Sequence, residues 1–494
     1  MNMTKSLILG SAAALLAMGG AQAADLPLKA KAVEYVRICS LYGAGFYYMP
    51  GTDTCIKLGG YVRADVGIMG GDYGFMQGTT QGANNRLTNY WTQRSRFDLT
   101  VDTRTATEYG VVRTYADTVF TVDTNNPTGS NPSTYPTPPG SGNPSLGLYH
   151  AFIQFAGFTF GRTYSIFDTP WQSYPAGGPD TIPGGSNHVT GINQVAYTAD
   201  FGQGITGSIA LDDETTAANG QSNLWNLSGA TAANMVTGVY GNNDWGGTRT
   251  PDIVGAIRVD QAWGLAQLSV AAHDMHAAYY GATEPSGHPS DKWGFAVQGG
   301  LSIKNIPTGP GDTINMNAVY TNGASHYNFQ SLFPQSFSMY SGSNVAYQSL
   351  GIAGIADGTF TNGSGIESVT SWGFRGGYTH NWNPNWASAI YGGYGQLRYG
   401  GAAKTTICAN AVTLLALNGT CNPDFNFSVI GVNTVWTPVK NLAFTVDVNW
   451  SNLDQKYSGT ITSPGVAASA KPAATYELKD QNSFSGLVRV QRNF

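Results

Sequence analysis

Residues 441–453, NLAFTVDVNWSNL, alternate apolar and polar side chains with a period of two. The apolar side chains fall on the even positions 442–450, and small or polar ones fall on the odd positions between them. The same alternation returns in 292–304, KWGFAVQGGLSIK, and in 313–320, TINMNAVY. Successive side chains of a β-strand point to opposite faces of a sheet, so each segment has one apolar and one polar face. These segments predict strands that separate an apolar from a polar environment.

Segments of this kind recur along most of the chain. We expect sixteen strands, at 57–69, 90–104, 109–121, 147–155, 158–164, 189–199, 203–213, 252–261, 264–276, 291–303, 311–321, 368–381, 386–399, 427–437, 441–453 and 483–494. The number is even, and most of these strands are long enough to cross a bilayer at a tilt.

The connections distinguish a membrane barrel from a soluble β-sandwich, which would show the same alternation. Tight links alternate with long polar loops: 200–202, 262–263, 383–385 and 438–440 are short, whereas 214–251, 322–367 and 454–482 are long. A sandwich has no reason to sort its loops in this way, but an outer-membrane barrel does. We therefore predict an all-β fold, a 16-stranded antiparallel transmembrane β-barrel over residues 57–494 with short periplasmic turns and long extracellular loops.

The N-terminus has the pattern of a secretory signal peptide. Lys5 is followed by the apolar stretch 7–18 and by the small-residue cleavage site 21–23, Ala-Gln-Ala. A retained membrane anchor is the alternative, but the apolar stretch is too short to cross a bilayer. We expect residues 1–23 to be removed, and residues 24–56 to form an ordered periplasmic or lumenal segment before the barrel.

The composition agrees with an exported barrel. Charged residues make up 11% of the chain, well below the roughly 25% of a typical soluble domain. Aromatic residues make up 12%, and such residues form the girdles at the two membrane interfaces. The formal net charge of -5 gives no basic footprint for nucleic acid.

Four cysteines suggest two disulfides in an oxidising compartment. Two local pairs, Cys39–Cys55 and Cys408–Cys421, are the simplest assignment, although the sequence alone leaves the connectivity open. A metal site is the alternative, but no CxxC spacing supports one. We expect neither a metal ion nor a cofactor.

Two stretches resemble the alphaproteobacterial, rhizobial-type outer-membrane porin family. They are 39–60, CSLYGAGFYYMPGTDTCIKLGG, followed by YVRADVG, and 158–168, FTFGRTYSIFD. The resemblance implies a homotrimer of barrels in the bacterial outer membrane, in contact with lipid and lipopolysaccharide. Each barrel would be a water-filled channel for passive diffusion of small hydrophilic solutes and ions. A substrate-preferring channel, for a sugar for example, and a barrel with a structural or adhesive role remain alternatives.

The same resemblance implies an inward-folded constriction loop at 164–188, with Asp168 and Asp180 as its acids. An ordinary surface loop is the alternative. The facing wall would carry bases, because strand parity places Arg63, Arg94 and Arg96 on the polar face, and Arg113 follows on the next strand. Acids facing bases across a narrow neck would create a transverse field. Alternatively, each arginine only pairs with an acid of the lumen.

The last strand ends in Phe494, with Phe484, Val488 and Val490 on the same parity. A terminal aromatic residue on an alternating strand resembles the signal that the barrel-assembly machinery reads. Arg492 departs from the apolar residue that is usual at its position.

Other function classes find little support. The seven histidines are scattered, and no HExxH or GxSxG spacing is present, so we expect no enzyme. His273 and His276 would point to opposite faces of one strand and are poor joint ligands. A plugged, energised transporter needs a globular domain before its barrel, and only about thirty residues would precede the first strand after cleavage.

Overall fold

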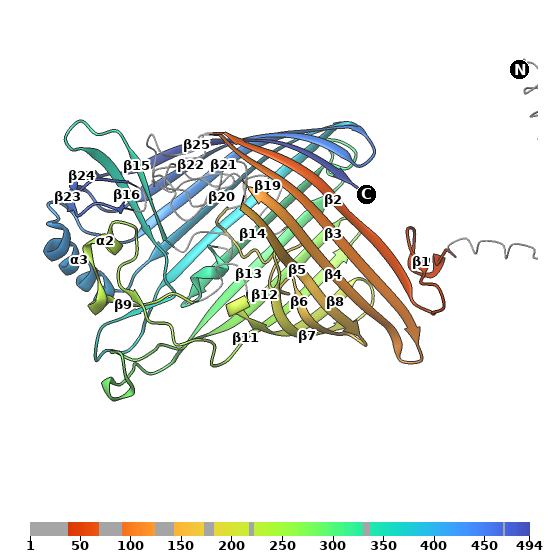
Figure 1. Ribbon diagram of the computed structural model, residues 1–494, viewed down its shortest axis with the longest axis horizontal. Helices are drawn as coiled ribbons and strands as arrows, with labels where there is room; N and C mark the ends of the chain where they lie inside the picture. The colour runs from red at the N-terminus through yellow and green to blue at the C-terminus, as the bar shows by residue number, and fades with distance from the viewer. Residues whose placement is uncertain are drawn as a thin grey trace, which may run out of the picture.

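The computed structural model describes residues 38–68, 91–123, 143–171, 182–216, 222–329, 336–467 and 470–494. Within these residues, sixteen strands form one closed antiparallel barrel (Figure 1). The barrel strands are β2 (Cys55–Ile68), β3 (Trp91–Thr107), β4 (Gly110–Asp123), β5 (Asn143–Phe155), β6 (Phe158–Thr163), β7 (Ile192–Asp200), β8 (Ile205–Asp213), β11 (Asp252–Gln261), β12 (Gly264–Met275), β13 (Lys292–Lys304), β14 (Thr313–Asn322), β19 (Thr370–Asn383), β20 (Trp386–Arg398), β21 (Phe425–Val439), β22 (Leu442–Gln455) and β25 (Gln481–Asn493). Every predicted strand is present, and its ends differ from the prediction by no more than four residues.

The barrel closes where its last strand meets its first. β25 pairs antiparallel with β2 from Tyr61↔Asn493 to Ile68↔Gly486. Lipid offers no hydrogen-bond partner to an unpaired strand edge, and closure removes that edge. The predicted all-β, 16-stranded antiparallel barrel is confirmed.

The two faces of the barrel wall differ as the alternation predicts. In β22, Val446 and Val448 are 53% and 48% exposed, whereas Asp447 and Asn449 are 2% and 3% exposed. The exposed apolar side chains cover the outside of the barrel, where lipid replaces water. The polar side chains face inward.

Tight turns lie at one end of the barrel, at the right of Figure 1, where the C-terminus also lies. This is the periplasmic end, because the short turns of a transmembrane barrel face the periplasm. At the β11–β12 turn, Gln261 pairs with Gly264, so only two residues form the link. Large aromatic side chains are exposed at or beside the turns of this end: Tyr109, Phe201, Trp263, Trp382, Trp386 and Trp436. They form the periplasmic girdle of a transmembrane barrel.

The long extracellular loops at 214–251, 322–367 and 454–482, where the structure describes them, are not the simple polar loops that we expected. They fold into an extracellular cap with two small sheets: β10-β9-β17-β18 and β15-β16-β24-β23. These strands are β9 (Leu224–Asn226), β10 (Asn242–Asn243), β15 (Ser336–Ser341), β16 (Gln348–Gly354), β17 (Gly358–Phe360), β18 (Glu367–Ser368), β23 (Gly459–Ser463) and β24 (Ala474–Leu478). An apolar core holds the cap together and continues onto the inner wall at Phe427 and Val429. The prediction failed because the loops carry apolar residues without a regular period.

Short helices complete the described chain. They are η1 (Ser40–Tyr42), η3 (Glu214–Thr216), η4 (Leu227–Gly229), α2 (Ala232–Met235), η5 (Glu284–Ser286), η6 (Ser325–Tyr327) and α3 (Gly401–Leu415). Among the residues described, no helix is both long and apolar enough to cross a membrane. In α3 a stripe of buried side chains recurs every four residues, at Ala403, Ile407, Ala411 and Leu415. This stripe packs α3 against the cap, and the Cys408–Cys421 disulfide joins α3 to the chain that follows.

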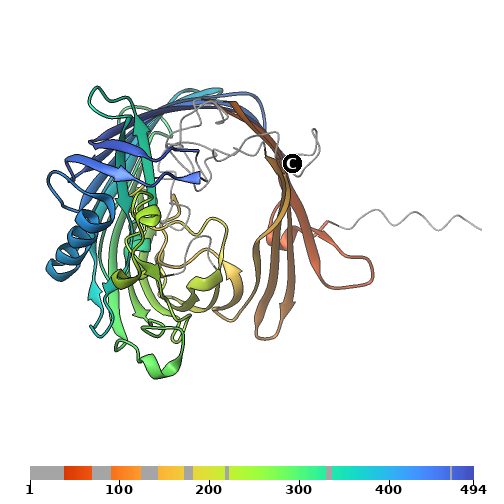
Figure 2. The ribbon, with the colours of Figure 1, turned by 60° about the vertical axis from the view of Figure 1, so that its left-hand side comes forward.

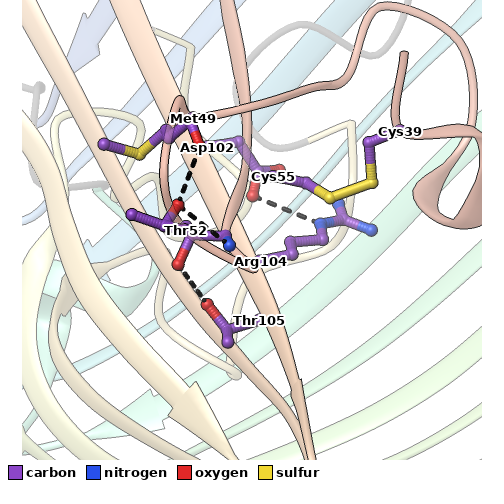
Figure 3. Close-up of a disulfide and its surroundings, with 8 residues drawn as sticks. Cys39, Met49, Thr52, Cys55, Asp102, Arg104 and Thr105 are labelled. Atoms are coloured by element: carbon purple, nitrogen blue, oxygen red, sulfur yellow. Dashed lines mark hydrogen bonds and ion pairs between the residues drawn. A yellow bond between two sulfur atoms is a disulfide. The ribbon is translucent and has the colours of Figure 1, made fainter. Parts of the chain in front are cut away.

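A small hairpin projects from the periplasmic end. β1 (Tyr47–Tyr48) pairs with the start of β2, and the Cys39–Cys55 disulfide joins the chain just before η1 to the first residue of β2 (Figure 3). The Thr54 hydroxyl lies 2.9 Å from that of Thr105 on β3. Both predicted disulfides are therefore present. The barrel begins two residues before the predicted boundary, and the predicted signal peptide, 1–23, lies outside the described residues.

Candidate pore and its constriction

The chain between β6 and β7 enters the barrel. We call residues 164–191 the inner loop; the structure describes 164–171 and 182–191 of it. Figure 2 shows the yellow chain that follows β6 inside the ring of strands. Phe167 and Ile182 are completely buried, which an ordinary surface loop would not require. The inward course predicted for this loop is confirmed.

The second half of the inner loop is held by its backbone to β14 and β19. Arg375, which is 1% exposed, donates to the carbonyls of Gly185 at 3.1 Å and Ser186 at 2.7 Å. The Arg375 Nε also donates to Asn317 Oδ1 at 3.1 Å. Asn317 Nδ2 in turn donates to the Gly184 carbonyl at 2.7 Å. Charged and amide donors thus satisfy loop carbonyls that would otherwise be buried without partners.

The first half of the inner loop is held in the same way by β12 and β13. Gln298 Nε2 donates to the Phe167 carbonyl at 2.9 Å, and Gln267 Nε2 donates to the Asp168 carbonyl at 2.9 Å. These contacts hold the loop against β12, β13, β14 and β19. Its first residues also contact β7 and β8, because Gln194 Nε2 donates to the Tyr164 carbonyl at 2.6 Å and the Ser165 hydroxyl donates to Asp212 Oδ2 at 2.6 Å.

Gly184 permits the closest approach of the loop to the wall. Its φ is +102°, and a Cβ at this position would lie 2.3 Å from the carbonyl carbon of Phe374. Both the backbone conformation and the contact exclude any other residue without local displacement.

Asp168 lies on the inner loop, but its carboxylate does not face the channel. The side chain is 1% exposed and accepts from the His188 backbone N–H at 2.6 Å, with His188 Nδ1 at 3.0 Å. Burial would raise the pKa of Asp168, but the His188 charge and the hydrogen bonds from His188 and Ser186 together outweigh burial and lower it. Burial would likewise lower the pKa of His188, and the Asp168 charge raises it well above its ordinary value. This ion pair joins the two halves of the loop. Asp180, the second predicted acid, lies outside the described residues.

Two of the predicted wall arginines face each other on the opposite side of the lumen. Arg63 on β2 and Arg96 on β3 are directly paired across the strands. Arg63 Nε lies 3.1 Å from Asp65 Oδ2, and Arg489 Nε on β25 donates to Asp65 Oδ1 at 2.6 Å. Arg63, Arg96 and Arg489 thus lie in one part of the wall, where the buried Asp65 carboxylate is shared by Arg63 and Arg489.

The other two predicted arginines differ in position. Arg94 forms a two-pronged ion pair with Asp123 on β4, at 2.8 and 3.1 Å. Arg113 on β4 lies opposite Arg104 on β3. Arg104 is eight residues further along β3 than Arg96, so Arg113 lies about 26 Å from the level of Arg96 at the rise of a strand. The four arginines therefore do not form one cluster. Parity predicts which face of the wall a side chain points to, but not its position along the barrel axis.

A polar hollow separates the inner loop from the wall on one side. It measures about 650 Å³, and its wall residues include Thr198, Thr206, Ser208 and Arg258. These side chains come from β7, β8 and β11. The hollow is large enough for many water molecules, and its lining combines these polar side chains with apolar ones such as Ile166 and Val189.

A group of buried histidines beside the inner loop was not found from the sequence. His188, His273 and His326 come from the inner loop, β12 and η6, and each is at most 8% exposed. Burial by itself lowers the pKa of His326, but the carboxylates of Glu214 and Asp357 outweigh burial and raise the pKa to about 10. No short-range spacing connects these residues, so only the fold could reveal the group.

A closed barrel with an apolar exterior, a polar interior and a loop fixed inside its lumen defines an outer-membrane channel. The chain belongs to the family described as "Porin subfamily", whose model matches residues 25–487. The protein is therefore a porin of the bacterial outer membrane.

Relatives agree with this assignment. Porin Omp2b of Brucella suis is 33% identical over 316 residues, which cover 61% of this chain and 75% of the relative. Porin Omp2a of Brucella ovis is 39% identical over 217 residues, 42% of this chain and 59% of the relative. The outer-membrane channel DcaP of Acinetobacter baumannii shares the fold with a TM-score of 0.57 at 15% identity, and the match covers 90% of this chain and 99% of that one.

Proposed function

We propose that the protein is a general diffusion pore, through which small hydrophilic solutes and ions pass beside the inner loop. The observation that carries this proposal is the fixed position of the loop. It is bound through its backbone to β12, β13, β14 and β19, whereas the arginines lie on β25, β2 and β3. This arrangement supports a path between the loop and the charged wall, with no catalytic step.

The charge distribution supports weak rather than strong ion selectivity. Arg63 and Arg489 share Asp65, and Arg94 is paired with Asp123, so much of the wall charge is balanced locally. Arg96 contacts the Thr121 hydroxyl at 3.1 Å and lies over the ring of Tyr149. We propose that Arg63 and Arg96 provide the positive side of the field at the neck.

Liposome swelling distinguishes a general pore from a substrate-preferring channel. Purified protein is reconstituted into liposomes, and swelling rates are measured with a series of neutral sugars and polyols of increasing size. A general pore gives rates that fall smoothly with solute size and show no saturation with concentration. Saturation by one sugar would support the substrate-preferring alternative, and no swelling at all would support a closed structural barrel.

Three further expectations remain proposals. We propose that residues 1–23 are removed on secretion and that Phe494 takes part in recognition by the assembly machinery. Phe494 is 57% exposed and stacks on Phe97, so its ring is accessible on the lipid-facing side. A homotrimer is proposed from the family resemblance, and cross-linking of membranes followed by denaturing electrophoresis would test it.

A further inference from the structure

Three buried side chains from distant parts of the chain meet at the extracellular end of the barrel. Asp252 begins β11, His273 lies near the end of β12, and His326 lies in η6. They are 3%, 3% and 8% exposed, so bulk water does not reach them. One ligand atom from each can be chosen so that all three lie within 4.8 Å of one another.

The ring of His326 is placed among carboxylates without a hydrogen bond. Its Nε2 lies 3.7 Å from Asp252 Oδ2 and 3.9 Å from Glu214 Oε1. Its Nδ1 lies 3.5 Å from Asp357 Oδ1. Both ring nitrogens are buried and lack a hydrogen-bond partner. A buried imidazole with neither nitrogen bonded is costly, so this arrangement requires an explanation.

The separations fit ligands of one metal ion better than hydrogen-bonded partners. Hydrogen bonds of this type are about 2.7–3.0 Å long. Two ligand atoms on one tetrahedral zinc ion, each at about 2.1 Å, lie about 3.4 Å apart. The distances of 3.7 and 3.9 Å from His326 Nε2 are close to that spacing and need only small side-chain movements.

His273 completes the donor set. Its Nδ1 lies 2.7 Å from Asp252 Oδ1, while its Nε2 is buried without a hydrogen-bond partner, 4.0 Å from Asp357 Oδ2. One carboxylate at one ring nitrogen and an open second nitrogen is a common arrangement for histidines that bind metal. The negative potential of Asp252, Glu214 and Asp357 at this place favours a cation.

We propose that Asp252, His273 and His326 bind a divalent transition-metal ion of the zinc class, with Glu214 and Asp357 as further carboxylates beside His326. Two imidazoles with one or two carboxylates suit Zn²⁺, whereas Ca²⁺ takes six to eight oxygen ligands. The bound ion would tie η6 to β11 and β12.

The site would also support the inner loop. Tyr327, next to His326, donates its hydroxyl to Asp252 Oδ2 at 2.7 Å. The Tyr327 ring packs on Phe167 of the inner loop, with ring centroids 4.4 Å apart. A metal ion at Asp252 and His326 would therefore fix the position of Tyr327, against which Phe167 of the inner loop packs.

The test is stoichiometric zinc binding by the folded, untagged protein in detergent. Protein treated with EDTA is dialysed against Zn²⁺, and bound metal is measured by mass spectrometry and located by anomalous diffraction at the zinc edge. We expect one strongly bound ion per chain, with its anomalous peak between His273 and His326. A wild-type protein that binds no ion at this place overturns the proposal and leaves a network of protonated histidines and carboxylates.

A ligand variant and a matched control make the test specific. His326→Gln should weaken Zn²⁺ binding by at least about 10-fold, since even changes beyond the ligands typically cost 10- to 100-fold. His288→Gln, at a histidine outside the cluster, should leave it unchanged. Heat-modifiable migration in electrophoresis confirms that each variant is folded. If folded His326→Gln binds Zn²⁺ as tightly as wild type does, the proposal is contradicted. If this variant does not fold, the presence or absence of the anomalous zinc peak in the wild-type protein decides whether the proposal stands.

Discussion

Arg63 and Arg96 are the residues at which the charge of the neck can be changed with least disturbance. They face each other on β2 and β3, and a change to glutamine keeps most of their length. We expect the double variant R63Q/R96Q to shift the reversal potential in a KCl gradient toward that of a cation-selective pore, because two positive charges leave the wall. The anion-to-cation permeability ratio should fall a few-fold.

Arg113→Gln is the matched control for this prediction. Arg113 is paired with Asp102 at 3.0 Å near the periplasmic end, far from the level of Arg96. Its removal should have a much smaller effect on the reversal potential. An unchanged potential in R63Q/R96Q would place these arginines outside the neck.

Asp312 makes the stability of the periplasmic end depend on pH. Its carboxylate accepts from the Asn381 N–H at 2.8 Å and the Thr308 hydroxyl at 2.6 Å, and it contacts His380 Nδ1 at 2.7 Å. Desolvation would raise the pKa of Asp312, but these hydrogen bonds outweigh it and hold the pKa well below its ordinary value.

A depressed pKa fixes the direction of the effect. The contribution of Asp312 is present above its unfolded-state pKa of about 3.9 and is lost as the pH falls toward the folded-state value. Urea-unfolding midpoints in detergent should decline below about pH 4 in wild type. Asp312→Asn should be less stable at neutral pH and show a smaller decline in acid. Glu108→Gln, at an exposed carboxyl of another turn, should behave as wild type, and an equal decline in both variants would refute the assignment.

For single residues, the sequence predicts the face of the strand to which a side chain points, but not the residues that it contacts. Parity placed Arg63 and Arg96 on the lumenal face correctly. The partners of Asp168 could not be foreseen, because His188 and Ser186 reach it only after the loop has folded back on itself. The same holds for His273 and His326, which are brought together by η6 and the end of β12.

Among the elements, the inner loop depends most on Arg375. Arg375→Met keeps a similar length but removes the donors to the carbonyls of Gly185 and Ser186. Each buried carbonyl left without a partner costs about 1–3 kcal/mol. We expect the loop to leave the wall for part of the time, so that single-channel currents become noisier and the loop becomes accessible to protease.

Arg258→Met is the control for the loop prediction. Arg258 is also an arginine of the inner wall, but its ion pair is with Asp260 on its own strand. This variant should keep the quiet current of wild type. If the single-channel current of Arg375→Met were as quiet as that of wild type and its loop as resistant to protease, the hydrogen bonds from Arg375 to the loop backbone would not be what holds the loop in place.

The positions of strands could be predicted where apolar and polar residues alternate regularly in the sequence. All sixteen barrel strands were placed from alternation and turn residues, with β5 the least accurate at its start. The cap was missed because its strands are only two to seven residues long, and such segments are too short to show a reliable period. The helix α3 did carry a signal, the four-residue spacing of Ala403, Ile407, Ala411 and Leu415.

At the scale of the whole molecule, one physical constraint connects sequence, fold and function. Lipid offers no hydrogen-bond partner to the backbone, so a sheet in the membrane must close into a barrel that leaves no strand edge unpaired. When each strand has one apolar face, the polar faces then enclose a lumen. β25 and β2 make that closure, and the inner loop is hydrogen-bonded to β12, β13, β14 and β19, across the lumen from the arginines of β2 and β3. An open aqueous path is the central claim that follows.

Single-channel recording of the wild-type protein in a planar bilayer tests that claim most directly. We predict discrete, long-lived current steps whose conductance rises in proportion to the KCl concentration, as for ions moving in a wet channel. Correctly folded protein that inserts into the bilayer and gives no steps above the background of the lipid alone would contradict the account.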